Sequence, residues 1–129
     1  MRGVNKVILV GNLGKDPEIM FLEGNIAVAK FSLATTETFK DKNGKVQSHT
    51  EWHNVVVWRG LAEFAQKSLQ KGSFVYIEGK LKTRYWEDKD HHKRSSTEII
   101  GENMIMLDKR IDGSGIDMEF SAPEDVPMK

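Results

Sequence analysis

The sequence predicts a small all-β barrel with one α-helix, and three observations support this class. Five stretches of the chain are rich in β-branched residues or carry apolar residues at alternate positions, as strands do. One stretch near the middle has the period of an amphipathic helix instead. The length of 129 residues allows a single hydrophobic core and a short tail.

The first three strands are expected at residues 4–10, 26–34 and 50–58. The first is a β-branched, apolar run that stops at a turn, residues 11–14 (GNLG). The second has apolar residues at every other position. A polar connection, residues 40–45, precedes the third strand and contains an Asn-Gly pair, which is a strong hairpin signal.

The helix and the last two strands follow. Apolar and small residues recur at helical spacing over residues 61–69, which predicts a helix of about three turns that ends at Lys71-Gly72. Residues 74–86 and 97–107 are expected to be extended, and the charged residues 87–94 between them form a loop or a hairpin tip.

Three strands, one helix and two long strands make the element order of an oligonucleotide/oligosaccharide-binding (OB) fold. That fold is a five-stranded Greek-key barrel with the helix between strands 3 and 4, and it binds its ligands on strands 2 and 3 and the long loops. The order also suits other small barrels, so it predicts the architecture but leaves the ligand open.

The charge of the chain is unevenly distributed although its total is zero. Residues 1–110 carry 18 basic and 14 acidic side chains, a net charge of +4, whereas residues 111–129 carry 1 and 5, a net charge of −4. The second part has Gly, Ser and Pro and no apolar period, so we expect a domain over residues 1–110 and a short, acidic, disordered tail over residues 111–129.

Cysteine is absent, which excludes disulfides, thiolate metal sites and Cys nucleophiles. No apolar run reaches the ~18 residues of a membrane span, and the first residues do not have the pattern of a secretory leader. We therefore expect a cytoplasmic protein with no membrane partner.

Two tryptophans stand out on the third strand. Because a strand points alternate residues to opposite faces, Trp52 and Trp58 share one face. The other face carries His53, Val55 and Val57. A separation of six residues corresponds to about 20 Å, the length of several nucleotides. The indole rings either form an exposed track or, as tryptophans often do, contribute to the core.

One face of the fourth strand carries a row of cations that ends in an indole: Lys80, Lys82, Arg84 and Trp86. Cations that follow phosphates, with rings that stack on bases, form the combination that binds single-stranded nucleic acid. The alternative is a solvated hairpin arm with ordinary surface charges. Phe39, beside Lys40 and Lys42, is a further candidate ring, or it anchors the loop to the barrel.

Other chemistry has little support, and we expect no enzyme, no metal and no cofactor. The adjacent His91 and His92 would diverge on an extended segment, and no second pair stands at ligand spacing. Paired carboxylates lie in polar surroundings, where nothing raises a pKa for acid–base catalysis. His53 fits best as a core or subunit-interface residue.

Three collinear blocks give the chain a family resemblance. They are residues 2–18 (RGVNKVILVGNLGKDPE), residues 50–53 (TEWH) and residues 71–81 (KGSFVYIEGKL). Over residues 2–108 the chain resembles the bacterial single-stranded DNA-binding protein. The resemblance implies a homotetramer of OB barrels with DNA wrapped over it, which acts in replication, recombination and repair at the nucleoid without catalysis.

The resemblance also assigns roles to residues. The family's stacking aromatics fall on Phe39, where Trp is usual, on Trp52, on Trp58, where Phe is usual, and on Trp86. The implied oligomer interface includes Asn5, Val7, Leu9, His53 and Tyr76. DNA contacts are therefore expected from Phe39, Trp52, Trp58 and Trp86 together with Lys80, Lys82 and Arg84.

The tail departs from the family pattern. Family members carry an acidic tip that ends in Ile-Pro-Phe, on which replication and repair proteins dock. Here the chain reads PEDVPMK over residues 123–129, so Met128 replaces the aromatic residue and Lys129 follows it. Docking of these partners stays open. An alternative function for the same barrel is a primosomal or RNA-binding adaptor whose main role is protein docking.

Overall fold

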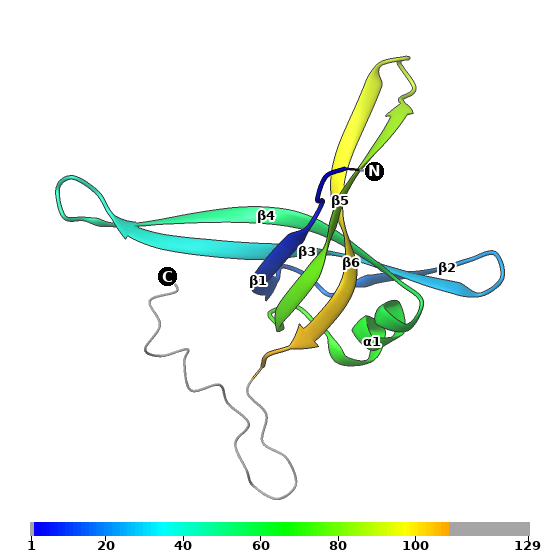
Figure 1. Ribbon diagram of the computed structural model, residues 1–129, viewed down its shortest axis with the longest axis horizontal. Helices are drawn as coiled ribbons and strands as arrows, with labels where there is room; N and C mark the ends of the chain where they lie inside the picture. The colour runs from blue at the N-terminus through cyan, green and yellow to red at the C-terminus, as the bar shows by residue number, and fades with distance from the viewer. Residues whose placement is uncertain (1, 109–129) are drawn as a thin grey trace, which may run out of the picture.

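The computed structural model describes residues 2–108, and seven elements follow one another in it (Figure 1). They are β1 (Val7–Leu13), β2 (Glu18–Leu22), β3 (Ile26–Lys40), β4 (Val46–Trp58), α1 (Gly60–Ser68), β5 (Phe74–Glu87) and β6 (Lys93–Met106). The strand order is β1-β5-β6-β4-β3-β2, and β1 also pairs with β3. Five strands thus close a barrel, which confirms the predicted all-β OB fold with one helix.

Strand β2 was not expected from the sequence. It pairs only with β3, from Glu18 opposite Lys30 to Leu22 opposite Ile26, and lies outside the closed barrel. Of its residues only Ile19 packs against the core, so the strand has little apolar alternation by which it could be recognised. The helix, which follows the third predicted strand, consequently lies between β4 and β5.

Strands β3 and β4 continue beyond the barrel as a long hairpin arm. They stay paired from Val28 opposite Trp58 to Lys40 opposite Val46, so the expected polar connection is only the tip of this arm (Figure 1). At the tip, an Asp41 carboxylate oxygen accepts the backbone N–H groups of Asn43 and Lys45, at 2.8 and 3.0 Å. The predicted Asn-Gly turn is therefore closed by an aspartate.

Helix α1 covers one opening of the barrel, as the spacing of its apolar residues predicted. Ala62 and Ala65 are fully buried, and Leu61 and Phe64 pack against the core from the same side. Leu69, which follows the last turn, is also buried. The helix ends there because the backbone of Leu69 is extended, although its N–H still donates to the carbonyl of Ala65.

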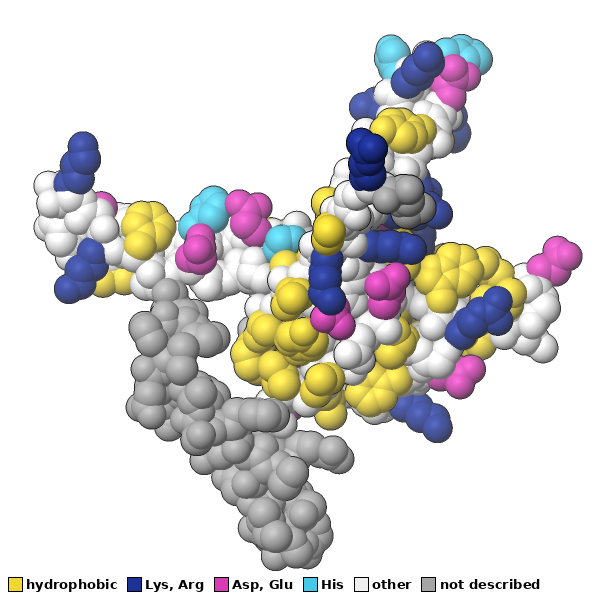
Figure 2. Space-filling model, viewed as in Figure 1, with side chains coloured by type: hydrophobic (Ala, Val, Ile, Leu, Met, Phe, Trp, Pro, Cys, Tyr) yellow, Lys and Arg dark blue, Asp and Glu magenta, His cyan; other side chains and the backbone are white. Residues whose placement is uncertain are grey.

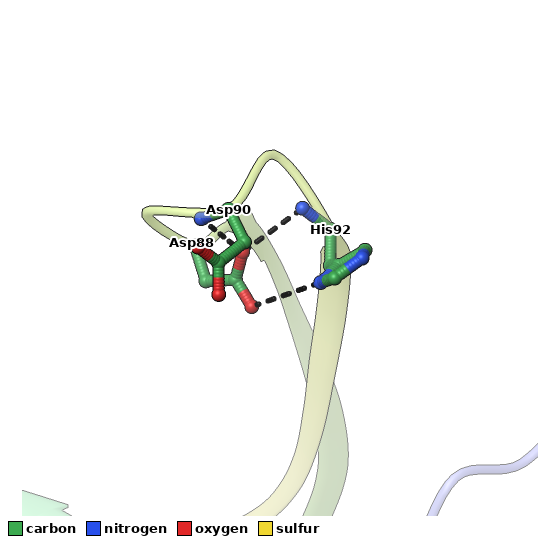
Figure 3. A group of neighbouring side chains, drawn as sticks. All are labelled: Asp88, Asp90 and His92. Atoms are coloured by element: carbon green, nitrogen blue, oxygen red, sulfur yellow. Dashed lines mark hydrogen bonds and ion pairs between the residues drawn. The ribbon is translucent and has the colours of Figure 1, made fainter.

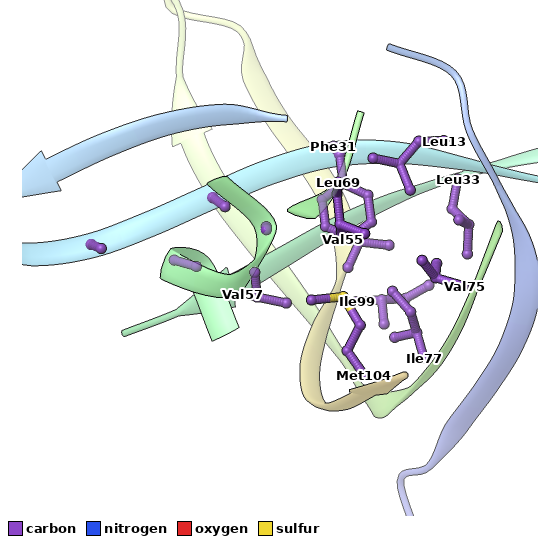
Figure 4. Close-up of a cluster of buried hydrophobic side chains, with 14 residues drawn as sticks. Leu13, Phe31, Leu33, Val55, Val57, Leu69, Val75, Ile77, Ile99 and Met104 are labelled. Carbon is purple, nitrogen blue, oxygen red and sulfur yellow. The ribbon is translucent and has the colours of Figure 1, made fainter. Parts of the chain in front are cut away.

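The core fills the barrel with side chains from the inner faces of the strands (Figure 4). Leu33, Val57, Val75 and Ile77 have no exposed surface. These residues belong to β3, β4 and β5, so the inner faces of these three strands meet in one core. Burial of such aliphatic side chains stabilises the fold by roughly 1.5–3 kcal/mol each.

Strand β5 leaves the barrel at Gly79. The register between β5 and β6 shifts between Glu78 and Gly79, and a Cβ at Gly79 would collide with the carbonyl oxygen of Ile100. Such a bulge bends a strand and increases its twist. Beyond it, residues 80–87 are all exposed and form the second hairpin arm with the start of β6 (Figure 1).

The described part of the chain ends two residues after β6. The predicted acidic tail, residues 111–129, lies outside the described residues. Among residues 2–108, no helix has both the length and the apolar character that crossing a membrane requires.

Candidate nucleic-acid interface

Trp52 and Trp58 lie at the two ends of one outward-facing row on β3 and β4. The row consists of four cross-strand pairs: Ala34–Trp52, Ser32–Asn54, Lys30–Val56 and Val28–Trp58. The tryptophans are 60% and 41% exposed, whereas Val55 and Val57 on the opposite face belong to the core. Neither indole ring is sealed inside the barrel, so both rings are open to a ligand, whereas Val28 and Val56 of the same row are nearly buried.

Gly14, directly after β1, lies against the ring of Trp52. A Cβ placed on Gly14 would lie 2.5 Å from a ring carbon of Trp52, so only a glycine lets the backbone pass this close to the indole. The N–H of Gly14 donates to the carbonyl of Ser32 at 3.0 Å, which ties the turn to β3. Gly14 is the only residue of the predicted GNLG turn that lies in a turn, because residues 11–13 belong to β1 and the first strand is thus shifted from residues 4–10 to Val7–Leu13. No phosphate-cradling helix follows Gly14.

Two hollows, of about 670 and 310 Å³, adjoin between this row and the β5–β6 arm. Both are lined by Lys30, Val56 and Glu98, so they form one continuous depression, which we call the groove. The larger hollow reaches Trp58, and the smaller one extends along Ser32 and Asn54 toward the Trp52 end of the row. A strand that follows the groove thus passes from one indole toward the other.

The walls of the groove differ in chemistry. One wall is the cationic face of β5, with Lys80, Lys82 and Arg84. In the larger hollow, β2, the strand that the sequence did not reveal, contributes an apolar wall with Met20 and Leu22. Such a groove offers anion-binding groups on one side and a surface for planar, apolar groups on the other. The smaller hollow is lined by the acidic residues Asp16 and Glu18 in addition to Lys15.

The cations of the arm are partly compensated by acidic neighbours (Figure 2). Lys80 Nζ lies 3.6 Å from a carboxylate oxygen of Glu102, and Arg84 is paired with Glu98. Lys82 has no ion-pair partner among residues 2–108. Of Lys80, Lys82 and Arg84, Lys82 is therefore the cation most available to an incoming anion.

Trp86 and Phe39 lie on the arms rather than in the groove. Trp86 is 43% exposed and borders a small hollow on the β5–β6 arm with Tyr85 and Lys93, and the guanidinium of Arg84 lies 5.3 Å from its ring centroid. Phe39 is 52% exposed near the tip of the β3–β4 arm. The structure thus groups Trp58 with the three cations and sets the other rings on surfaces that extend away from them.

Sequence reasoning missed several residues of the site. Lys30 could have been found, because alternation in the second predicted strand places it on the face that Val56 and Trp58 share. Tyr85 is 80% exposed on the arm, on the face opposite Trp86. Glu98 gave no signal, because a single acidic residue in a strand is usually solvated.

The residues expected at an oligomer interface make contacts within their own chain. Val7 and Leu9 pack against the core of their own barrel. The Asn5 amide donates to the carbonyl of Leu81 and accepts its N–H, both at 2.9 Å, so it extends the pairing of β1 with β5. His53 lies within hydrogen-bond distance of the Thr35 hydroxyl, with 2.9 Å between Nε2 and Oγ1.

The outward residues of β1 form an apolar surface instead. Ile8 and Val10 are 55% and 37% exposed, and Val10 lies opposite Tyr76 on β5. Tyr76 in turn lies opposite Ile105 on β6, which is 49% exposed. Val10, Tyr76 and Ile105 therefore form a continuous row across three strands, with Ile8 beside it; we call this the β1 face.

A cluster at the tip of the second arm brings Asp88, Asp90 and His92 together (Figure 3). One Asp88 oxygen accepts the backbone N–H groups of Asp90 and His92, both at 2.9 Å, and the other accepts Arg94 Nε–H at 2.8 Å. The pKa of the Asp88 carboxyl lies below its ordinary value, chiefly because of the hydrogen bond from the backbone N–H of His92 and next because of the hydrogen bond from the Arg94 side chain. These hydrogen bonds explain why the three side chains lie together: Asp88 stabilises the hairpin turn at the tip of the arm.

Comparison with known proteins agrees with this geometry. Residues 4–107 match the model of the single-strand binding protein family. A solved structure described as a Plasmodium falciparum SSB complex with ssDNA is 38% identical in sequence and superimposes with a TM-score of 0.75. The match covers 84% of this chain and 98% of that one. The chain therefore belongs to the single-strand binding protein family.

Proposed function

We propose that the protein binds single-stranded DNA without sequence preference. The observation that carries the proposal is the groove, with a cationic wall of β5, an apolar wall of β2 and exposed indole rings along the row that it follows. Family membership and the similarity to an SSB solved with ssDNA support the same ligand. No sequence preference is expected, because every base has a π-face on which an indole can stack.

The cationic wall binds the phosphates of the strand, and the apolar wall binds its bases. Phosphates follow Lys82 and Lys80, and bases turn toward Trp58 and the apolar β2 wall. Each stacked base contributes roughly 1–3 kcal/mol. In a duplex the faces of the bases are covered by neighbouring base pairs and cannot stack on a protein ring. A site that depends on stacking therefore distinguishes single strands from double strands.

Intrinsic tryptophan fluorescence tests the proposal directly. Titration with poly(dT) is expected to quench the emission, whereas duplex DNA of equal phosphate content leaves it nearly unchanged. Repeating the titration at several salt concentrations should give a log–log slope of about −0.7 for each phosphate that the protein neutralises. Equal quenching by duplex DNA would contradict the proposed selectivity for single strands.

The proposal extends to a homotetramer. Four of the residues expected at the interface lie on β1 or β5 or just before β1, namely Asn5, Val7, Leu9 and Tyr76, and His53 lies on β4. The exposed β1 face supports association, because contiguous apolar surface on a soluble protein marks an interaction site.

Light scattering checks the assembly. The wild-type chain is expected at four times the mass of one chain, and Ile105→Glu, which places a charge at the β6 end of the β1 face, should reduce that mass. Phe21→Glu is the matched control, since Phe21 is 59% exposed on β2 and lies outside the β1 face. A tetramer that tolerates Ile105→Glu would place the interface elsewhere.

A protein that coats single strands acts where DNA is unwound. We therefore place the function in replication, recombination and repair, in the cytoplasm at the nucleoid. The acidic tail, on which replication and repair proteins would dock, lies outside the described residues, and its last two residues, Met128 and Lys129, differ from the family tip.

A further inference from the structure

Glu98 is a nearly buried carboxylate in a groove that we propose binds a polyanion. The residue is 8% exposed, and it lines both hollows of the groove. A negative charge at this position repels phosphate and costs free energy through its desolvation. Its presence therefore calls for a compensating role.

The compensating contact is a two-pronged ion pair with Arg84. Arg84 Nε donates to one carboxylate oxygen at 3.1 Å and a terminal guanidinium nitrogen donates to the other at 3.2 Å. This arrangement satisfies both oxygens and fixes the plane of the guanidinium. A lysine–carboxylate pair, such as Lys80 with Glu102 at 3.6 Å, imposes no such plane.

The fixed guanidinium is the one that lies over Trp86. Its central carbon is 5.3 Å from the centroid of the indole ring, within the range of a cation–π contact. Arg84 thus spans from Glu98, at the base of the arm, to Trp86, farther along the same face of β5. The chain Glu98–Arg84–Trp86 connects the groove to the stacking surface of the arm.

We infer that Glu98 is a positioning residue that makes binding selective for bases over bare phosphate backbone. It neutralises Arg84 toward phosphates and holds the guanidinium against Trp86, so that this part of the arm supports ring stacking and adds little charge attraction. Lys82, the cross-strand neighbour of Glu98, has no ion pair within the described residues and keeps the phosphate-binding role. The inference rests on the proposed function and names a residue that sets its selectivity.

The experiment compares two ligands of equal length and charge. Oligo(dT) and an abasic oligomer, which has the same phosphates and no bases, are titrated into wild type and Glu98→Gln at several salt concentrations. The variant is expected to bind the abasic oligomer more tightly, and its salt slope should steepen by about 0.7 as Arg84 becomes free to neutralise a phosphate. The preference for oligo(dT) should fall about two- to fivefold, the factor of an exposed cation–π contact.

Two further variants separate selectivity from simple charge or folding effects. Glu102→Gln removes one negative charge from the same strand, and it should shift both affinities by the same factor and leave their ratio unchanged. Arg84→Lys keeps the charge but loses the plane over Trp86, so it should lower the preference for oligo(dT) without a steeper salt slope. Thermal unfolding of each variant confirms that the barrel is intact.

A measurement without DNA tests the contact itself. In a Trp52→Phe/Trp58→Phe background Trp86 is the only tryptophan, and Glu98→Gln should lower its fluorescence anisotropy as the guanidinium is released. Unchanged anisotropy, or an unchanged ligand ratio and salt slope in a variant that still binds oligo(dT), would overturn the inference alone. Failure of the wild type to bind oligo(dT) would overturn the proposed function instead.

Discussion

Replacing Trp52 and Trp86 together by alanine is expected to weaken binding of oligo(dT) by about 2–6 kcal/mol, since each base–ring stack contributes roughly 1–3 kcal/mol. Both rings are exposed, at 60% and 43%, so their removal leaves the core untouched. The dissociation constant can be measured by fluorescence anisotropy of a labelled oligonucleotide, which does not depend on the tryptophans that were removed.

Phe21→Ala is the matched control for this variant. Phe21 is 59% exposed but does not line the groove, so its removal should change the affinity by less than about 0.5 kcal/mol, as surface substitutions usually do. A double tryptophan variant that binds as tightly as the control would favour the adaptor alternative, in which strand binding is secondary to protein docking.

Leu33→Ala is expected to lower the free energy of unfolding by about 2–5 kcal/mol, the range for large-to-small changes in a rigid core. Leu33 has no exposed surface and is among the largest fully buried side chains (Figure 4). Its strand neighbours Lys30 and Ser32 face the groove, so the substitution tests the scaffold without removing a groove side chain.

Chemical denaturation measures the effect of this substitution. Val46→Ala provides the control, because Val46 is 63% exposed at the tip of the first arm and its truncation should cost less than about 0.5 kcal/mol. Equal midpoints for the two variants would mean that the barrel interior does not hold the fold together.

Most of the fold was predictable because the apolar pattern of each segment matches the face that the segment buries in the barrel. The five barrel strands and the helix were found from alternation and helical spacing, since each buries one face against a single core. The shared face of Trp52 and Trp58 followed from strand geometry alone. Alternation is reliable here because β3 and β4 are paired without a register shift from Val28 to Lys40.

The missed features depend on contacts that no local pattern encodes. Strand β2 is an edge strand with only Ile19 against the core, so its pairing with β3 decides its structure. The lengths of the two arms follow from cross-strand pairing outside the core, where exposed residues carry no alternation. The Arg84–Glu98 pair joins residues 14 apart on two strands and becomes visible only once the register is known.

The residues of the proposed oligomer interface stay a prediction, and the structure shows only which side of β1 is exposed. The family resemblance gave Val7 and Leu9, but these residues pack inward, and the neighbouring positions Ile8 and Val10 carry the exposed apolar surface. A short, apolar strand such as β1 does not reveal which of its faces is inside. Gly11 belongs to the inner face, where its backbone lies so close to β3 that a Cβ would collide with the carbonyl oxygen of Ala34.

The bend at Gly79 divides β5 into a segment whose residues are constrained by the core and a segment whose residues are not. Before it, alternate residues of β5 are locked into the interior; after it, none of the side chains from Lys80 to Glu87 is buried. Substitutions in the second segment therefore leave the stability of the scaffold almost unaffected. Ligand contacts can diversify there from one relative to the next, while the barrel that carries them stays the same.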